Sequence, residues 1–313
     1  MHPAVSVIFF TVSSGAGFGL FALLYLADLL KLGGGFSRGQ IATTGVIALV
    51  FVIAGLLSSV AHLANPKNAW RAFSRFRTSW LSREGVFAVA FFPFAFVYLV
   101  LSWFAVPGLE GVRLALGGMA TLLAWITVFS TGMIYACLKT IRQWNTPLVP
   151  ANYLALGHAS GALMLLAVAA WAGLALQSFV YVAAGFLILA ALLKAIYYYW
   201  MAEPGASSSI QTATGFTRAQ VKLLDTGHTH GTFLTQEFGF QLARRHALTL
   251  KAFVFAAGFI APLVLLAATG GQPSLLLGGL ITGMALLGLV AERWLFFAEA
   301  RHVVNLYHGS QRC

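Results

Sequence analysis

Eight long apolar stretches constrain this chain more than any other feature of its sequence. Each is continuously apolar over about 20 residues, the length that a helix needs to cross roughly 30 Å of hydrocarbon. A β-barrel is disfavoured, because barrel strands alternate in hydrophobicity over about ten residues. The stretches run approximately Val5–Ala27, Ile41–Leu63, Val86–Val106, Leu114–Cys137, Tyr153–Leu176, Phe179–Tyr199, Ala252–Thr269 and Ser274–Ala291.

The overall composition agrees with these stretches. Of all residues, 59% are hydrophobic and 9% charged, whereas a soluble domain has about 25% charged residues. We therefore predict an all-α integral membrane protein, an eight-transmembrane-helix bundle, that forms a single membrane domain over residues 1-313. The first stretch contains Ser13, Ser14, Gly15, Gly17 and Gly19. Small residues at this spacing predict a close contact between the backbones of two helices.

Lysine and arginine are distributed unequally between the two sides of the predicted bundle. Eight spans place both termini on one side, and that side carries 16 of the chain's 19 Lys and Arg residues. The positive-inside rule then predicts that both termini are cytoplasmic, in the bacterial inner (plasma) membrane. The net charge of +11 would suggest nucleic acid if the protein were soluble. Here the basic residues flank apolar spans and indicate which side of the membrane is cytoplasmic, so we expect contact with membrane lipid and no nucleic-acid partner.

The polar segments gather on the same basic side. Two cytoplasmic loops are long, about residues 65-85 and 201-250, and the second is too polar to span the membrane. Residues 292-308 continue the last span, and we predict that they form an amphipathic C-terminal segment at the interface or against a partner. We expect no charged residue deep inside a span, which argues against a transporter.

A histidine and a glutamate flank the first of these loops. His62 ends the second span and Glu84 begins the third. A carboxylate near hydrocarbon is costly unless it has a partner or a role, and local roles are open: Arg83 pairs with Glu84, or Ser82 or Glu84 caps the helix. Together, His62 and Glu84 can bind and release protons, as quinone chemistry requires. We predict them as catalytic residues of a quinone site.

The segment before the third span supplies further candidates. A quinone pocket needs hydrogen-bond donors for the carbonyl oxygens and an apolar wall for the ring and tail. We predict quinone-binding roles for Arg77, Trp80, Ser82 and Arg83.

The histidines predict neither haem nor a metal site. His62 and His158 are both expected near the basic face, where two axial histidines would suffice for haem, but their spacing does not favour ligation over structural roles. His228 and His230 resemble a metal pair, yet no cluster of Cys, Asp or Glu completes the three or four ligands that zinc needs. We therefore expect no haem and no metal ligands.

Four segments resemble the membrane anchor subunit family of dimethyl sulfoxide reductase, and the resemblance covers essentially the whole chain. They are Met1–Thr11, Ala69–Phe73, Arg77–Glu84 and Glu292–Ala300. The resemblance implies eight helices, no haem, and a complex with an iron–sulfur subunit and a molybdopterin catalytic subunit, which hold the molybdopterin and iron–sulfur clusters. It also implies that the anchor exchanges electrons with menaquinone or ubiquinone, and that His62 and Glu84 match positions associated with quinol binding.

The loop Leu224–Phe240 is more similar to the relatives in quinone-linked sulfite dehydrogenases, whose catalytic subunits are cytoplasmic. The expected function is therefore electron transfer from sulfite to quinone. The alternative is a quinol-oxidising anchor of a dimethyl sulfoxide or N-oxide reductase in anaerobic respiration. A purely structural anchor and a membrane transporter remain as rivals from other classes.

Overall fold

The computed structural model describes the chain except residues 1–3, 62, 64, 203–207, 226–245 and 309. Within this described part, eight helices are long and apolar enough to cross a membrane, which confirms the predicted bundle. They are α1 (Val5–Leu29), α2 (Arg38–Ala61), α3 (Trp80–Phe104), α4 (Glu110–Ala136), α5 (Leu148–Trp171), α6 (Gln177–Ala202), the segment Ala247–Ala268 and α12 (Leu275–Ala298). The seventh span consists of α10 (Ala247–Phe255), the π-helical turn η3 (Ala256–Ile260) and α11 (Ala261–Ala268).

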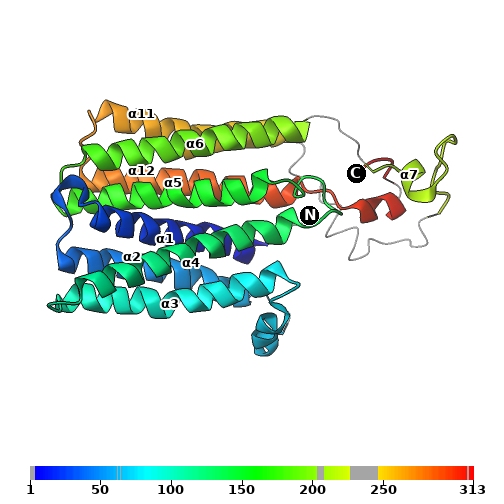
Figure 1. The fold of residues 1–313 in the computed structure, drawn as a ribbon. Helices are drawn as coiled ribbons and strands as arrows, with labels where there is room; N and C mark the ends of the chain where they lie inside the picture. Colours follow the sequence, from blue (N-terminus) through cyan, green and yellow to red (C-terminus); the bar gives the residue numbers. More distant parts are fainter. Residues whose placement is uncertain (1–3, 62, 64, 203–207, 226–245, 309) are drawn as a thin grey trace.

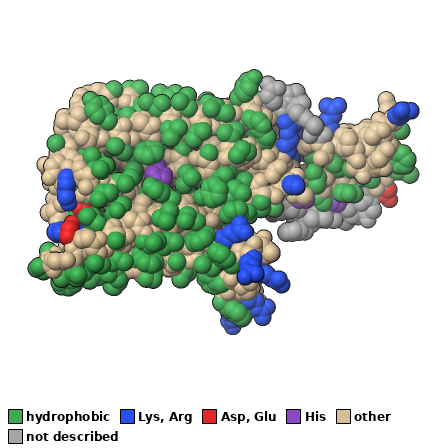
Figure 2. All heavy atoms as spheres, in the orientation of Figure 1, with side chains coloured by type: hydrophobic (Ala, Val, Ile, Leu, Met, Phe, Trp, Pro, Cys, Tyr) green, Lys and Arg blue, Asp and Glu red, His purple; other side chains and the backbone are tan. Residues whose placement is uncertain are grey.

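The helices lie side by side along one direction, and the two ends of the bundle differ in charge (Figures 1 and 2). We call one the basic end: it carries η2 (Pro66–Arg75), the α4–α5 connector (residues 137–147), α7 (Ile210–Thr214) and η4 (Val303–His308). The opposite end carries η1 (Leu32–Gly34) and the starts of α2 and α4. Between the two ends, hydrophobic side chains cover much of the visible flank in Figure 2, as a surface in contact with lipid requires.

Helices α1 and α5 form the centre of the bundle. In α1, 78% of the apolar window is buried and in α5 67%, whereas no other span exceeds 44%. Their backbones touch: a Cβ atom placed on Gly19 would lie 2.0 Å from the Gly157 carbonyl oxygen, and one on Gly161 would lie 2.4 Å from the Gly19 carbonyl carbon. The close contact predicted from the small residues of the first span is confirmed.

A network of ion pairs joins the helices at the end of the bundle opposite the basic end. Asp28 of α1 and Arg113 of α4 form an ion pair of 2.5 Å, with side chains 0% and 1% exposed. Tyr98 donates a hydrogen bond of 2.9 Å to the same carboxylate, and Arg113 also pairs with Glu110 at 2.7 Å. Arg38 of α2 pairs with Glu110 in turn. Four helices are therefore joined by this network, in which Asp28 and Arg113 are buried and Arg38 and Glu110 are partly exposed.

Candidate functional site

Glu84 lies in the second turn of α3, at the basic end. The helix begins after Ser79, whose hydroxyl accepts a hydrogen bond of 3.4 Å from the Ser82 backbone N–H. The expectation that Ser82 or Glu84 caps this helix is therefore wrong, because the chain turns into the helix three residues earlier. The Glu84 side chain points into the bundle, is 5% exposed, and accepts a hydrogen bond from the Thr131 hydroxyl of α4.

Arg83 is not the partner of Glu84. Its guanidinium donates to the carbonyl oxygens of Phe76 at 3.1 Å and Arg77 at 2.8 Å. It also lies 4.3 Å from the centroid of the Trp80 ring. Neighbouring residues on a helix project about 100° apart, so Arg83 faces the surface while Glu84 faces α4. Among the described residues no ion pair of Glu84 is found.

The other predicted quinone-binding residues divide between two faces. Trp80, one turn before Glu84, packs edge-on against Phe129 of α4, with ring centroids 6.0 Å apart. Ser82 is buried, and its hydroxyl donates to the carbonyl oxygen of Ala72 in η2. Arg77 is exposed and contributes only its carbonyl oxygen to this region. His62 lies outside the described residues, so its proximity to Glu84 stays a prediction.

Segment η2 covers this site from the basic end. Besides the bond from Ser82 to Ala72, the Phe73 ring packs against the start of α3, where a Cβ on Gly85 would lie 3.3 Å from it. The same segment carries Lys67, Arg71 and Arg75. These contacts lie on other sides of α3 than Glu84, which faces α4 and is buried between the two helices with 5% of its surface exposed.

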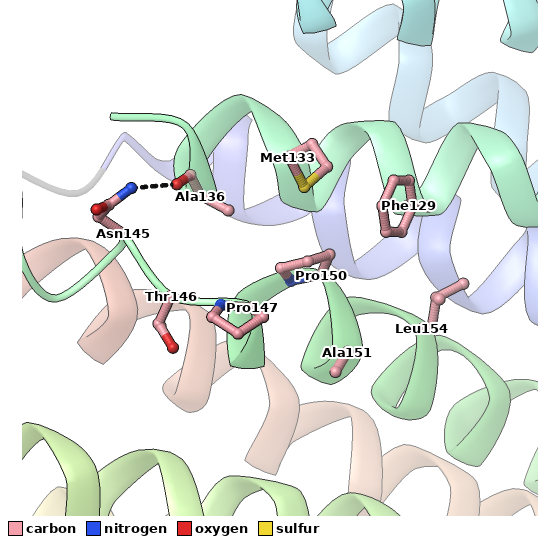
Figure 3. A pocket seen from close by; sticks show the side chains of 9 residues that line it. All are labelled: Phe129, Met133, Ala136, Asn145, Thr146, Pro147, Pro150, Ala151 and Leu154. Atoms are coloured by element: carbon pink, nitrogen blue, oxygen red, sulfur yellow. Dashed lines mark hydrogen bonds between the residues drawn. The ribbon is translucent and has the colours of Figure 1, made fainter. Parts of the chain in front are cut away.

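An apolar groove of about 550 Å³ lies between α4 and α5 at the same end (Figure 3). It is lined by Phe129, Met133 and Ala136 of α4, Asn145, Thr146 and Pro147 of the connector, and Pro150, Ala151 and Leu154 of α5. Asn145 donates a hydrogen bond of 2.6 Å to the Ala136 carbonyl oxygen, which fixes the mouth of the groove. Because Phe129 contacts both this groove and Trp80, the groove begins next to the helix face that carries Glu84.

His158 does not lie near the basic face, contrary to expectation. It sits at the middle of α5, where its Nε2 accepts a hydrogen bond of 2.8 Å from the Trp125 indole and its Nδ1 lies 2.7 Å from the Leu154 carbonyl oxygen. Its ring stacks on Phe186. Both ring nitrogens are engaged in helix packing. Within the described residues no group of three His, Cys, Asp or Glu side chains could hold a metal ion; His228 and His230 lie outside them.

A second set of buried charges was not predicted. Lys194 of α6 pairs with Glu292 of α12, and Glu292 also lies 3.4 Å from Arg293. These side chains are 2%, 0% and 5% exposed, so the expectation that no charge lies deep inside a span is wrong. The Arg293 guanidinium lies 3.7 Å from the centroid of the Tyr153 ring.

The residues that follow the last apolar stretch also differ from the expectation. Residues 292-308 were predicted to form an amphipathic segment, but α12 continues to Ala298 with Glu292, Arg293 and Leu295 buried, and only η4 lies beyond it. The signal was present in the sequence as Lys194 inside the sixth apolar stretch. What could not be seen is that α12 supplies the compensating carboxylate.

Comparison with known proteins agrees with this architecture. The family model of the DMSO reductase anchor subunit (DmsC) matches residues 1–298. A sulfite dehydrogenase subunit of Allochromatium vinosum is 35% identical to this chain, over 99% of the chain and 99% of the relative. With the eight-helix fold, these matches cover the whole membrane domain. The chain belongs to the family of DMSO reductase anchor subunits, as a multi-pass membrane protein.

Proposed function

We propose that this chain is the quinone-reactive membrane anchor of a sulfite dehydrogenase, and that it passes electrons from an iron–sulfur subunit to a membrane quinone. The observation that carries the proposal is Glu84, a buried carboxylate that accepts a hydrogen bond from the Thr131 hydroxyl and has no ion pair within the described part of the chain. A carboxylate without a cation inside a membrane domain is costly, and such residues usually mark proton or substrate sites. The name of the similar A. vinosum protein supports sulfite as the electron donor.

In this proposal Glu84 exchanges protons with a quinone carbonyl oxygen between α3 and α4. Trp80 forms an aromatic wall on the same face of α3, and His62 is the second proton-exchanging group. The apolar groove beyond Phe129 fits an isoprenoid tail, because it is open, lined mostly by hydrocarbon and continuous with the Trp80 contact. Menaquinone and ubiquinone both have such a tail.

The basic end is proposed as the cytoplasmic surface that receives the partner subunits. The sequence assigns 16 of 19 Lys and Arg residues to this side, which the positive-inside rule places in the cytoplasm together with both termini. The iron–sulfur subunit would bind next to the enclosed Glu84, and the molybdopterin subunit would bind to the iron–sulfur subunit. The membrane is then the bacterial inner membrane.

The test is the Glu84→Gln variant of the assembled complex. Gln keeps the shape and still accepts the Thr131 hydrogen bond, but it cannot release a proton. Sulfite-dependent reduction of quinone should fall at least tenfold, whereas sulfite oxidation by an artificial acceptor that bypasses the anchor should not change. Glu110→Gln, at the opposite end, is the matched control and should keep quinone turnover. Normal quinone turnover in Glu84→Gln would show that the site is elsewhere.

The family match supports one alternative function, in which the anchor oxidises quinol and supplies the electrons to a dimethyl sulfoxide or N-oxide reductase. The same residues would then act in the reverse direction. Purified complex offered sulfite with quinone, and separately quinol with dimethyl sulfoxide or an N-oxide, decides between the two by which pair turns over.

A further inference from the structure

Charged and aromatic side chains form a continuous path from the surface of the basic end toward the interior. It starts at Lys251 of α10 and Glu299 at the end of α12, an ion pair of 2.8 Å whose side chains are 23% and 13% exposed. The Lys251 ammonium lies 4.8 Å from the centroid of the Tyr198 ring, and the ammonium of Lys194 lies at the same distance from that ring. Tyr198 therefore joins the outer ion pair to the buried one.

The path continues from α6 through α12 to α5. Lys194 pairs with Glu292, and the other carboxylate oxygen of Glu292 lies 3.4 Å from Arg293. The Arg293 guanidinium in turn covers the ring of Tyr153 at 3.7 Å. The two cations offset the charge of the carboxylate, so a fully buried acidic group is tolerated here.

The last section leads from α5 to Glu84. The rings of Tyr153 and Tyr135 are stacked, with centroids 5.9 Å apart and an angle of 22° between their planes. Tyr135 is one helical turn from Thr131 on α4, and Thr131 donates its hydroxyl hydrogen bond to Glu84. Six helices, α3, α4, α5, α6, α10 and α12, contribute to one chain of polar groups.

Unsatisfied polar atoms are concentrated on this path. In the described part of the chain, six buried side-chain atoms lack a hydrogen-bond partner, and three of them belong to the path: Tyr153 OH, Tyr198 OH and Glu292 Oε2, which faces Arg293 at 3.4 Å without a hydrogen bond. Buried polar groups in folded proteins are almost always hydrogen-bonded, and internal water is the usual partner where protein atoms do not serve. Such waters would bridge the gaps between the ring hydroxyls and the carboxylate.

We propose that this path is a hydrated proton relay that connects Glu84 with the solvent at the basic end. It rests on the proposed function of Glu84. Reduction of one quinone consumes two electrons, supplied by the iron–sulfur subunit, and two protons, one for each carbonyl oxygen. Glu84 gives a proton to the quinone and regains one through the hydroxyls of Tyr135 and Tyr153 and the waters between them, each of which releases a proton as it receives another; a second such cycle supplies the second carbonyl oxygen. Arg293 keeps its proton throughout and only offsets the charge of Glu292. The final donor is solvent near Glu299, so the relay itself ends unchanged.

A relay is needed because Glu84 is buried between α3 and α4, with only 5% of its surface exposed. The competing interpretation is that the ion pairs only clamp α5, α6 and α12 together. The two interpretations differ for the Tyr153 hydroxyl, which makes no hydrogen bond to α6 or α12 in the described part of the chain and lies on a ring that stacks on Tyr135 of α4. It therefore contributes nothing to a clamp of α5, α6 and α12.

The experiment is the Tyr153→Phe variant of the full complex, assayed in H₂O and D₂O. No hydrogen bond to α6 or α12 in the described part of the chain is lost, so assembly and sulfite oxidation by the artificial acceptor should equal those of the wild type. Quinone turnover should fall at least fivefold, and its solvent isotope effect should rise. Thr121→Val is the matched control: it removes another buried hydroxyl without a partner in the same part of the chain, ten residues before Thr131 and so about 15 Å away along α4, and should change neither quantity.

Unchanged turnover and isotope effect in Tyr153→Phe would overturn the relay. That result is distinct from a failure of the proposed function. If the relay alone is wrong, Glu84→Gln remains inactive toward quinone while Tyr153→Phe is active. If the quinone site is wrong, Glu84→Gln itself is active, and the relay is wrong as well.

Discussion

The ion pair between Asp28 and Arg113 should dominate the stability of the opposite end, and Asp28→Asn tests this. The substitution keeps the size of the side chain and an acceptor for the Tyr98 hydroxyl, but it removes the charge that faces Arg113 at 2.5 Å. Removing one partner of a buried ion pair costs about 3–5 kcal/mol. Arg113 retains Glu110, whose side chain is 45% exposed. We therefore expect the lower limit, a loss of about 3 kcal/mol in the free energy of unfolding.

The same reasoning predicts that removing both buried charges together is tolerated. Well-packed apolar residues often replace a buried ion pair without loss of stability. The triple variant Asp28→Leu, Arg113→Met and Tyr98→Phe also removes the hydroxyl that would otherwise lose its acceptor. We expect its free energy of unfolding to lie within about 1 kcal/mol of the wild type, because no buried polar group is left unpaired.

Equilibrium unfolding in mixed micelles of dodecyl maltoside and SDS, followed by tryptophan fluorescence, measures both variants on one scale. A loss below about 1 kcal/mol for Asp28→Asn would refute the assignment of this end's stability to the buried pair. A triple variant less stable than the single one would refute the claim that the cost arises from an uncompensated charge.

Two further substitutions test the packing and the groove. Gly19→Ala places a methyl group against the Gly157 backbone and should cost about 3 kcal/mol or more in the same unfolding assay, whereas Gly39→Ala, where a Cβ meets no atom within 4 Å, should be neutral or slightly stabilising. Ala151→Trp fills the groove and should raise the KM for a long-tailed quinone at least fivefold, while the KM for a short-tailed analogue should not change. Equal effects on both quinones would show that the groove does not bind the tail.

The number and order of the spans could be predicted from the sequence because bilayer thickness sets the length of an apolar stretch. The ends of the helices could not. Asp28, Glu110 and Glu292 lie just outside the apolar stretches, yet all three lie within helices in the structure. Their charges are compensated by residues of other spans or by neighbours on the same helix, and a partner on another span is invisible in a sequence read one segment at a time.

The candidate site, too, could be predicted only in part from the sequence. Glu84 was identified from its place beside an apolar stretch, and its burial agrees with that choice. Thr131 and Tyr153 were not identified, because helices that are apolar on all sides give no periodic signal for the face that turns inward. Only the packing of the helices shows that the Thr131 hydroxyl of α4 contacts Glu84 and that Tyr153 of α5 stacks on Tyr135 of α4.

The glycine-mediated contact of α1 and α5 has a consequence for the synthesis and membrane insertion of the protein. In α1, Gly15 and Gly19 form a surface for α5, whereas Gly17 packs against α2. Helix α5 begins only at Leu148, after three other spans have been synthesised. Until α5 arrives, α1 sits in the bilayer with this surface turned to lipid or to a provisional contact. Assembly of the bundle therefore waits for its fifth span, and a chain truncated before α5 should be recognised by membrane quality control as an orphan.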